Sequence, residues 1–438
     1  VWAKPKAFPH IFRKAHIGCG KRKGVEIMKN RHSRICAAFL AILMLAMALT
    51  AGVGATGTEG SGSGTEAPVG DEKPTPVLSD LGVEDGSLEL PCKSAILMEA
   101  TTGAVLYSQN AEEAMPPASV TKIMTLLLLM EAIDSGIIRL DDTVTVSANA
   151  ASMGGSQIYL KEGEQMKLED LLKSVVIASA NDAAVALAEY LAGSVQSFVG
   201  KMNGRAKQLE MTGTNFENVT GLDDTATNHL TCARDIAIMS RELIKHETIL
   251  KYSSIWMDTI RDGAFGLTNT NRLVRFYPGC TGLKTGSTSK AGFCVSVTAK
   301  RDGFSLICVI MGADSRDVRN AAAVSLLEWG FANYGLFEAD GVQNETIPVT
   351  GGVRNSCALT GEGFRAVLPK AQISAVRQSI LKPEAISAPV KTGDAVGSVS
   401  YTVEGRVIGQ IPLTAAENVE KIGFFEILGR VLARFLLV

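Results

Sequence analysis

Histidine is scarce in this sequence, and its scarcity argues against two kinds of active site. Of five His among 438 residues, only His229 and His246 lie beyond residue 35. No His-Glu-x-x-His pattern is present, and no metal is expected. The neighbours of these histidines, Ala226-Thr-Asn and Lys245, do not suggest a Ser-His-Asp triad. A serine hydrolase built from this chain therefore needs another base, for which lysine is the usual substitute.

Strong charge and patterned cysteines are also missing. The formal net charge is −2, and no basic stripe lies beyond the first 35 residues, so nucleic-acid binding is not expected. The cysteines after residue 55 are scattered, without a Cys-x-x-Cys pair, which argues against a metal site or a disulfide scaffold. They are Cys92, Cys232, Cys280, Cys294, Cys308 and Cys357. No cofactor is implied.

The amino-terminal region has the layout of a secretory signal peptide. A basic head and an apolar run fill 28–49, and Val53-Gly-Ala55 fits a small-x-small cleavage site. The apolar run is short for a membrane span. We therefore expect a signal peptide at 28–55 and export to the outer face of the cytoplasmic membrane, on its periplasmic or extracellular side. Residues 1–27 are interpreted as a possible non-native upstream extension, and 56–84 as a flexible leader rich in Gly, Ser, Thr and Pro.

The rest of the chain predicts an α/β unit followed by an all-β unit. With 46% hydrophobic residues, a chain of 438 residues can bury a sizeable core. In 85–338, hairpin patterns at 94–110 and 292–313 alternate with helical periods, which predicts an antiparallel sheet with flanking helices. From 339 to 413 the helical periods stop, and short alternating segments predict a small β-sandwich.

The carboxyl-terminal segment, 414–438, predicts an amphipathic helix. Glu426, Arg430 and Arg434 recur at four-residue spacing along one face. Apolar side chains fill the other faces: Phe424, Phe425, Ile427, Leu428, Val431, Leu432 and Phe435. We expect this helix to lie on a membrane surface rather than to cross the bilayer. A terminal helix docked on the protein's own core is the alternative.

A serine stands three residues before a lysine at the start of the apolar run 119–133. Ser119 and Lys122 would share one face of a helix, whose N-terminus offers N–H groups and a positive dipole end to an oxyanion. As a base, Lys122 needs a pKa about three units below its free value near 10.4, which desolvation and a nearby cation can supply. The pattern alone is weak, because it recurs at Ser287–Lys290 and Ser379–Lys382, and Ser119 as a mere helix cap is the alternative.

Two further motifs decide between these copies, because only one combination has the right order and context. Ser179-Ala-Asn181 lies between two predicted helices and supplies a hydroxyl for proton relay and an amide to orient substrate or lysine. Lys284-Thr285-Gly286 enters a predicted strand and supplies a cation, a hydroxyl and a residue without a side chain where substrate must lie close. Copies at Ser108–Asn110, Ser147–Asn149 and Lys391–Gly393 lack this context. The complete set occurs in penicillin-binding proteins and class A β-lactamases.

From about Cys92 to Tyr334 the chain resembles the low-molecular-mass penicillin-binding proteins, the serine-type D-alanyl-D-alanine carboxypeptidases of peptidase family S11. The resemblance rests on PPASVTKIMT, GGSQIYLKEGE, LEDLLKSVVIASANDAAVALAE, NVTGLDD, NTNRL, GLKTGSTSKAGFC and VIMGADSRDVR, which run in order. It implies a β-lactamase/transpeptidase-like catalytic domain with a helical subdomain. The β segment and the amphipathic tail are similar to that family's second domain and membrane anchor.

The resemblance also implies a reaction and its catalytic residues. The reaction is removal of the terminal D-alanine from peptidoglycan stem pentapeptides, and β-lactams, which mimic D-Ala-D-Ala, would acylate the same serine. Ser119 would be the nucleophile and Lys122 its base. Ser179 would pass the proton to the leaving D-alanine, and Asn181 would contact the substrate amide.

The remaining site residues are implied to bind substrate. Lys284 and Thr285 would hold the terminal carboxylate region, next to Gly286. The N–H groups of the nucleophile and of Ser287 would form the oxyanion hole. Arg319 is implied to assist with the carboxylate, and a solvated helix charge is the alternative.

Three other functions are weighed against the carboxypeptidase. A class A β-lactamase would add a Glu followed four residues later by Asn, whereas here Glu217 is followed directly by Asn218, and Gly221 stands at the fourth place. An inactive cell-wall-binding homologue would have a broken motif, whereas the key positions are intact. A D,D-endopeptidase of the same family, which would cut cross-links, is separated poorly by the sequence.

Overall fold

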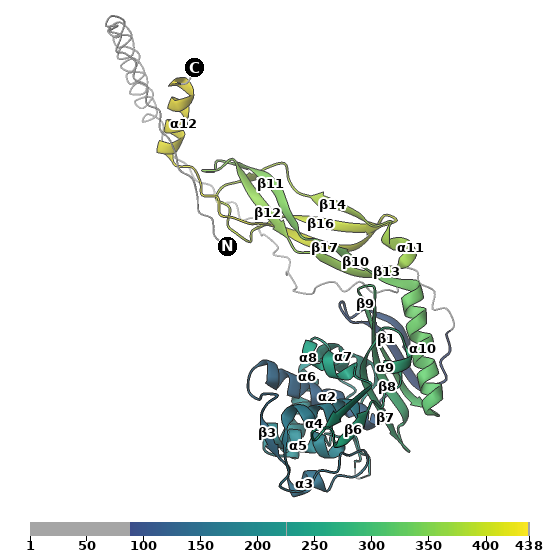
Figure 1. The fold of residues 1–438 in the computed structure, drawn as a ribbon. Helices are drawn as coiled ribbons and strands as arrows, with labels where there is room; N and C mark the ends of the chain where they lie inside the picture. The colour runs from purple at the N-terminus through teal and green to yellow at the C-terminus, as the bar shows by residue number, and fades with distance from the viewer. Residues whose placement is uncertain (1–87, 225, 437–438) are drawn as a thin grey trace, which may run out of the picture. The chain divides into compact units, whose positions relative to one another are not determined.

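The fold consists of an α/β part, an all-β part and a terminal helix (Figure 1). The computed structural model describes residues 88–224 and 226–436. The predicted upstream extension, signal peptide and leader, at 1–27, 28–55 and 56–84, lie outside the described residues. The predicted fold class is confirmed.

An antiparallel sheet with strand order β2-β1-β9-β8-β7 forms the centre of the α/β part. Its strands are β1 (Ser94–Glu99), β2 (Val105–Gln109), β7 (Cys280–Thr288), β8 (Gly292–Arg301) and β9 (Phe304–Ala313). The hairpins predicted from sequence are β1–β2 and β8–β9, and β1 pairs with β9 so that Ile96 stands opposite Val309. Strand β7 is an edge of the sheet, and one side of its backbone therefore faces away from the other strands.

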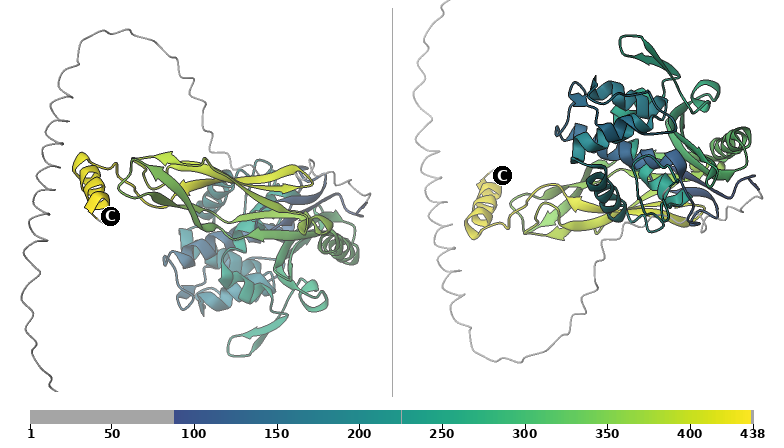
Figure 2. Two further views of the ribbon diagram at one scale, coloured as in Figure 1. Left: turned by 90° about the horizontal axis from the view of Figure 1, so that it is seen from above. Right: turned by 90° about the horizontal axis from the view of Figure 1, so that it is seen from below.

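Helices cover both faces of this sheet (Figure 1). They are α2 (Lys122–Asp134), α3 (Ala148–Ala151), α4 (Leu168–Ile177), α5 (Asn181–Ala192), α6 (Val195–Gln208), α7 (Ala233–Leu243), α8 (Glu247–Ser253), α9 (Leu273–Phe276) and α10 (Arg316–Asn333). Ile96 and Met98 pack in one core with α2, α4, α5 and α7, whereas Ala95 and Leu97 pack in another with α10. This alternation is the two-residue period of a strand buried on both faces. Figure 2 shows the same layers from two further sides.

Two small two-stranded sheets accompany the helical layer. One consists of β3 (Thr143–Thr145) and β4 (Gln165–Lys167), and the other of β5 (Met257–Ile260) and β6 (Phe265–Thr268).

Helix α2 is the buried centre of the helical layer. Its residues from Lys122 to Met130 are buried, except for the half-buried Leu128. A helix that is apolar on all sides is covered on all sides, so the lysine at its first position lies in the core. The sequence predicted that Ser119 starts this helix, but the residue lies in a preceding 3₁₀ turn, η2 (Ala118–Thr121). Its side chain caps neither element.

The all-β part has a core of its own. Its elements are β10 (Tyr334–Ala339), β11 (Val342–Thr350), β12 (Ser356–Gly361), β13 (Phe364–Pro369), the single turn α11 (Lys370–Ile373), β14 (Arg377–Leu381), β15 (Ile386–Ser387), β16 (Ala395–Val403) and β17 (Arg406–Ala415). β10 pairs with β13, and the other strands form a sheet in the order β14-β16-β17-β12-β11-β15. Tyr401 and Leu413 are among the residues that fill the core. β10 starts at Tyr334, ahead of the expected boundary at 339.

The terminal helix α12 (Phe424–Leu436) exposes its apolar side chains. None of its described residues is buried, and Phe425 and Phe435 are 84% and 81% exposed. The helix begins at Phe424 rather than at 414, and β17 continues to Ala415, so the first residues of the expected segment belong to the all-β part. This exposure does not favour docking on the protein's own core. Among the helices described, none has the length and apolar character that a membrane span requires.

Candidate active site

Ser119 and Lys122 meet where η2 joins α2. Lys122 Nζ lies 2.9 Å from Ser119 Oγ. The lysine is 0% exposed, whereas the serine is half-buried and lines a cleft. The hydroxyl is therefore open to a substrate while its neighbouring amine is sealed from water.

The hydrogen bonds of Lys122 are compatible with a neutral amine. Its Nζ lies 2.6 Å from Asn181 Oδ1 and 2.8 Å from the carbonyl oxygen of Thr220. Both oxygens can only accept, so they take two N–H groups of the amine. In the neutral form the remaining position is a lone pair, and the hydroxyl of Ser119 can donate to it. Neutral Lys122 is thus fully hydrogen-bonded and is directed as a base at Ser119.

Burial and a second cation support this protonation state. Desolvation lowers the pKa of Lys122 well below its ordinary value, and the charge of Lys284 lowers it further. The Asp182 carboxylate acts in the opposite direction. That carboxylate, however, accepts hydrogen bonds from the backbone N–H groups of Ile158 and Leu160, at 3.1 and 3.0 Å.

Ser179 lies in the short connection between α4 and α5, and Asn181 is the first residue of α5. Ser179 has a φ of 64°, in the left-handed region that is uncommon for residues other than glycine. Asn181 is 2% exposed, and its Nδ2 donates to the carbonyl oxygen of Gly154 at 2.7 Å. The sequence left open whether this amide orients substrate or lysine, and the structure places it on Lys122. The implied contact with the substrate amide stays a prediction.

Lys284 connects Ser179 to the edge strand β7. Its Nζ donates to Ser179 Oγ at 2.8 Å and to the carbonyl oxygen of Thr285 at 3.0 Å. Lys284 is 1% exposed, and burial, with a smaller effect of the Arg319 charge, lowers its pKa to about 7. The hydroxyl of Thr285 donates to Thr270 Oγ1 at 2.8 Å.

Gly286 allows β7 and the nucleophile's turn to approach each other. A Cβ at this position would lie 2.7 Å from the backbone nitrogen of Ser119 and 3.0 Å from the carbonyl oxygen of Pro117. The sequence suggested that glycine makes room for substrate, whereas the structure shows that it makes room for Ser119. This packing places the backbone of Ser119 beside β7, where Ser287 also lines the cleft.

Arg319 of α10 is buried beside the cleft rather than solvated. It is 3% exposed, and its Nη1 donates to the carbonyl oxygen of Cys294 at 3.3 Å. Its Nε and Nη2 donate to Asn320 Oδ1 at 3.1 and 2.9 Å. Burial lowers the pKa of Arg319 to about 10, and the Arg316 charge acts in the same direction. The alternative interpretation as a solvated helix charge is therefore wrong.

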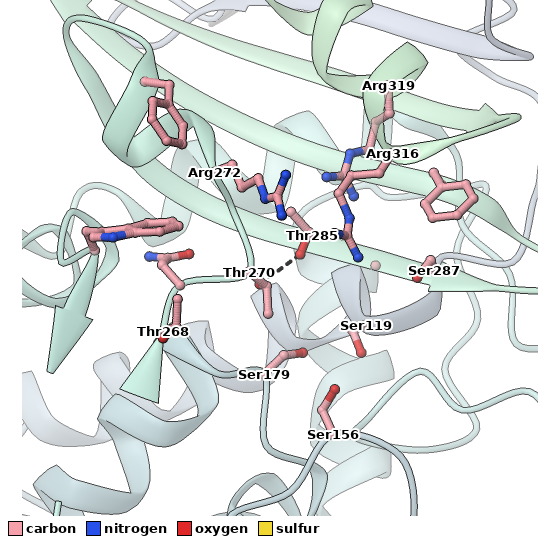
Figure 3. Close-up of a pocket in the computed structure, with 15 residues that line it drawn as sticks. Ser119, Ser156, Ser179, Thr268, Thr270, Arg272, Thr285, Ser287, Arg316 and Arg319 are labelled. Carbon is pink, nitrogen blue, oxygen red and sulfur yellow. Dashed lines mark hydrogen bonds between the residues drawn. The ribbon is translucent and has the colours of Figure 1, made fainter. Parts of the chain in front are cut away.

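These residues border one cleft of about 680 Å³ (Figure 3). The residues that line it are Ser119, Ser156, Ser179, Trp256, Thr268, Asn269, Thr270, Arg272, Phe276, Thr285, Gly286, Ser287, Phe293, Arg316 and Arg319. In Figure 3 the three labelled serines of the helical layer face Thr285 and the arginines across the cleft. Of the described residues that line it, none is acidic.

The other copies of the motifs are engaged elsewhere. Lys290 Nζ donates to a backbone carbonyl oxygen at 2.7 Å, and Lys382 forms an ion pair with Glu345. Lys391 is exposed before β16. Burial raises the pKa of the Cys280 thiol to about 11, which argues against a nucleophilic thiolate.

A buried histidine beneath the nucleophile was not predicted from the sequence. His229 Nδ1 accepts a hydrogen bond from the backbone N–H of Glu217 at 2.9 Å, which places the proton on Nε2. Nε2 then donates to Thr121 Oγ1 at 2.7 Å, and Thr121 donates to the carbonyl oxygen of Ala118 at 2.8 Å. Ala118 has a φ of 49° and directly precedes Ser119. The histidine thus supports the unusual backbone that presents the nucleophile.

An antiparallel sheet with Ser-x-x-Lys, Ser-x-Asn and Lys-Thr-Gly gathered at one edge defines the class of penicillin-recognising serine enzymes. Residues 82–315 match the family described as Peptidase S11, D-alanyl-D-alanine carboxypeptidase. Residues 331–421 match the C-terminal domain of penicillin-binding protein 5. The chain belongs to the S11 family of D-alanyl-D-alanine carboxypeptidases, which confirms the resemblance found in the sequence.

Individual relatives support this assignment. D-alanyl-D-alanine carboxypeptidase DacF of Bacillus subtilis is 41% identical over 360 residues, covering 80% of this chain and 91% of the relative. The structure of penicillin binding protein 5 from Haemophilus influenzae is similar with a TM-score of 0.68 and 30% identity, over 76% of this chain and 98% of that chain. Penicillin-binding protein D2 from Listeria monocytogenes, in its ampicillin-bound form, has a TM-score of 0.52 and 32% identity, over 56% of this chain and 99% of that chain.

Replacing His229 with Ala is expected to slow acylation by fluorescent penicillin about tenfold, because the turn that carries Ser119 loses its support. The buried Thr121 and the backbone N–H of Glu217 would each also lose a hydrogen bond, at a cost of about 1–3 kcal/mol of folding free energy. Acylation rates and thermal melts measure the two effects. His246→Ala is the matched control, since His246 pairs with Asp134 away from the cleft. Unchanged acylation by His229→Ala would contradict the assigned support.

The pH dependence of stability gives an independent readout for His229. Burial lowers its folded pKa to about 4, from an ordinary value of 6.5. The depressed folded pKa means that the neutral imidazole contributes to the free energy of unfolding. This contribution is fully present above the unfolded pKa and is lost as pH falls from about 6.5 towards 4. The wild type should therefore lose more melting temperature between pH 7 and 5 than His229→Ala does.

Proposed function

We propose that this protein is a serine-type D-Ala-D-Ala carboxypeptidase that removes the terminal D-alanine from peptidoglycan stem pentapeptides through an acyl-enzyme. The observation that carries the proposal is the contact between Ser119 and a buried Lys122 whose other hydrogen bonds go to obligate acceptors. β-Lactams acylate the same serine, as the ampicillin-bound relative supports.

Acylation begins with the transfer of the Ser119 hydroxyl proton to Lys122 Nζ. The oxygen attacks the carbonyl carbon of the penultimate D-alanine, and the resulting oxyanion is stabilised by the N–H groups of Ser119 and Ser287. A preformed base contributes about 10²–10⁴-fold to such a step. The carboxylate of the terminal residue is held by Lys284, Thr285 and the buried Arg319.

The C–N bond then breaks, and the leaving amine takes a proton from Ser179. Ser179 is suited to this role because its Oγ accepts a hydrogen bond from Lys284 Nζ at 2.8 Å, which leaves its own proton free to be given to the amine. The proton that Lys122 took from Ser119 then returns to Ser179, so Lys122 is neutral again and Lys284 keeps its charge. The acyl-serine ester remains until a water, deprotonated by Lys122, attacks the ester carbonyl and regenerates Ser119.

A β-lactamase function is disfavoured by the position of Glu217. Its carboxylate accepts hydrogen bonds from the backbone N–H groups of Thr227 and Asn228, at 2.9 and 3.1 Å, and does not line the cleft. No acidic residue among the described lining is available to activate water for fast deacylation.

The test uses protein that lacks residues 1–55. It should be labelled covalently by fluorescent penicillin, and it should release D-alanine from a diacyl-D-Ala-D-Ala peptide. Rapid hydrolysis of penicillin without D-alanine release would overturn the proposal in favour of a lactamase.

Peptidoglycan as substrate places the enzyme outside the cytoplasm, and we propose that α12 holds it on the outer face of the membrane. The exposed apolar side chains of α12 and the basic Arg430 and Arg434 match a helix that lies in a lipid interface. A predicted signal peptide at 28–55 is the route of export.

Replacing Phe425 and Phe435 with Asp is expected to weaken binding to phosphatidylglycerol-containing vesicles by about 100-fold. The reason is that two aromatic side chains that would be buried in the lipid are lost. Sedimentation with vesicles measures this. Leu381→Asp is the matched control, since Leu381 is an apolar residue 58% exposed on β14. Equal sedimentation of the double variant and the wild type would refute the membrane role of α12.

A further inference from the structure

The cleft continues beyond the position of the terminal carboxylate on the side of the leaving group. The scissile carbonyl must lie at Ser119, and the leaving nitrogen must face Ser179, which protonates it. The next group along the substrate reaches Thr285, whose hydroxyl contacts Thr270. Past Thr270 the cleft is lined by Arg272, Trp256 and Phe276. A cleft of about 680 Å³ leaves room for a leaving group larger than alanine.

This extension has more positive charge than one carboxylate requires. Arg319 and Lys284 are buried and hydrogen-bonded at the expected carboxylate position. Arg272 and Arg316 also line the cleft but are exposed. In the described part of the chain, neither of these two guanidinium groups has a hydrogen-bond or ion-pair partner. Figure 3 shows both turned towards Thr285 from opposite sides.

Arg272 is mounted on a rigid segment. It directly precedes α9, and its neighbour Asn271 is 1% exposed. Asn271 Nδ2 donates to the carbonyl oxygen of Gly282 at 3.0 Å, and its Oδ1 accepts from the N–H of Leu273 at 3.1 Å. Asn269 is similarly buried, and its Oδ1 accepts from the N–H of Asn271 at 2.9 Å. The backbone of Arg272 is thus tied to β7, which limits the backbone entropy that is lost when its side chain binds a ligand.

An aromatic wall stands beside this arginine. The rings of Trp256 and Phe276 meet edge to face at a centroid distance of 6.1 Å. The guanidinium of Arg275 lies 5.7 Å from both ring centroids, so this second arginine is engaged with the wall and does not line the cleft. The wall offers apolar contact to the aliphatic part of a side chain whose charged end reaches Arg272.

We propose that Arg272 and this wall form a second anion subsite, which takes a leaving residue that carries a carboxylate in addition to the one bound at Thr285. The inference rests on the proposed carboxypeptidase reaction and narrows its substrate class. Such a residue can be an acidic D-amino acid at the end of a stem peptide. The bond broken and the fate of the proton are those of the basic reaction.

The test compares diacyl-L-Lys-D-Ala-X peptides in which X is D-Ala, D-Glu or its neutral isostere D-Gln. The wild type should cleave the D-Glu peptide with a kcat/KM about two- to fivefold above that of D-Gln, the size of one partly exposed ion pair. Arg272→Gln should bring this ratio to about one and leave the kcat of D-Ala release and the final extent of penicillin labelling unchanged. Arg275→Gln, a change of the same charge in the same segment, should keep the ratio.

The outcomes separate the subsite from the basic function. A D-Glu/D-Gln ratio that Arg272→Gln does not change would overturn the subsite. An equal loss for all three peptides would also overturn it, because Arg272 would then bind the terminal carboxylate. Failure of the wild type to release D-alanine would instead contradict the carboxypeptidase.

Discussion

Replacing Ser119 with Ala is expected to abolish covalent labelling by fluorescent penicillin and to lower D-alanine release by at least about 10⁴-fold. No other hydroxyl in the cleft contacts Lys122, because the remaining hydrogen bonds of its Nζ go to an amide oxygen and a carbonyl oxygen. The variant should still fold, since the half-buried hydroxyl caps no helix. Gel fluorescence, D-alanine release and a thermal melt measure these effects.

The copy of Ser-x-x-Lys that lies in the all-β part provides the matched control for this variant. Ser379 lies on β14, and Lys382 is paired with Glu345, so Ser379→Ala should keep full labelling and activity. Labelling of the Ser119→Ala variant at the wild-type rate would show that the nucleophile is a different residue.

Lys122→Arg is expected to lower acylation by about 10²–10⁴-fold, the usual contribution of a general base. An arginine stays protonated in proteins, so it has no lone pair to offer Ser119. Stopped-flow acylation by penicillin measures the loss. The decoy variant Lys382→Arg should be unaffected. An acylation rate within about threefold of the wild type would exclude Lys122 as the base.

The pH profile of the wild type tests the same assignment from the other side. Lys122 must be neutral to act, and its pKa is lowered, so kcat/KM rises with pH as Lys122 loses its proton. Lys284 must be charged to hold a carboxylate, and its pKa of about 7 in the free enzyme predicts a fall of kcat/KM above neutral pH. The expected profile is a bell, and a profile that does not fall between about pH 7 and 9 would contradict the role of Lys284.

Local patterns in the sequence predicted the parts of the site that depend on local geometry. The contact between Ser119 and Lys122 follows from their spacing, and it survives although Ser119 lies in a 3₁₀ turn rather than in the helix. The hairpins β1–β2 and β8–β9 follow from alternation and turn residues. The order of the three motifs identified the true copies, because each motif was expected beside a different element: the start of a helix, the link between two helices and the start of a strand.

The parts that the sequence could not predict depend on long-range packing. The carbonyl oxygen of Thr220 completes the shell of Lys122 from 98 residues away, and no side chain announces a backbone acceptor. His229 is 108 residues from Thr121, and its role needs a tautomer set by a backbone N–H. The extent of burial of Arg319 also required the fold, because a helical position alone does not tell which face is covered.

The absence of acidic residues from the described lining of the cleft has a consequence for diffusion. The exposed Arg272 and Arg316, with the buried Arg319 and Lys284 behind them, produce a positive potential that reaches into solution, and an anion is drawn towards the nucleophile before any contact forms. Salt screens this attraction over a distance of about 8–10 Å at moderate ionic strength. Capture of anionic peptides and antibiotics is therefore expected to slow as ionic strength rises, while the chemistry that follows at Ser119 changes little.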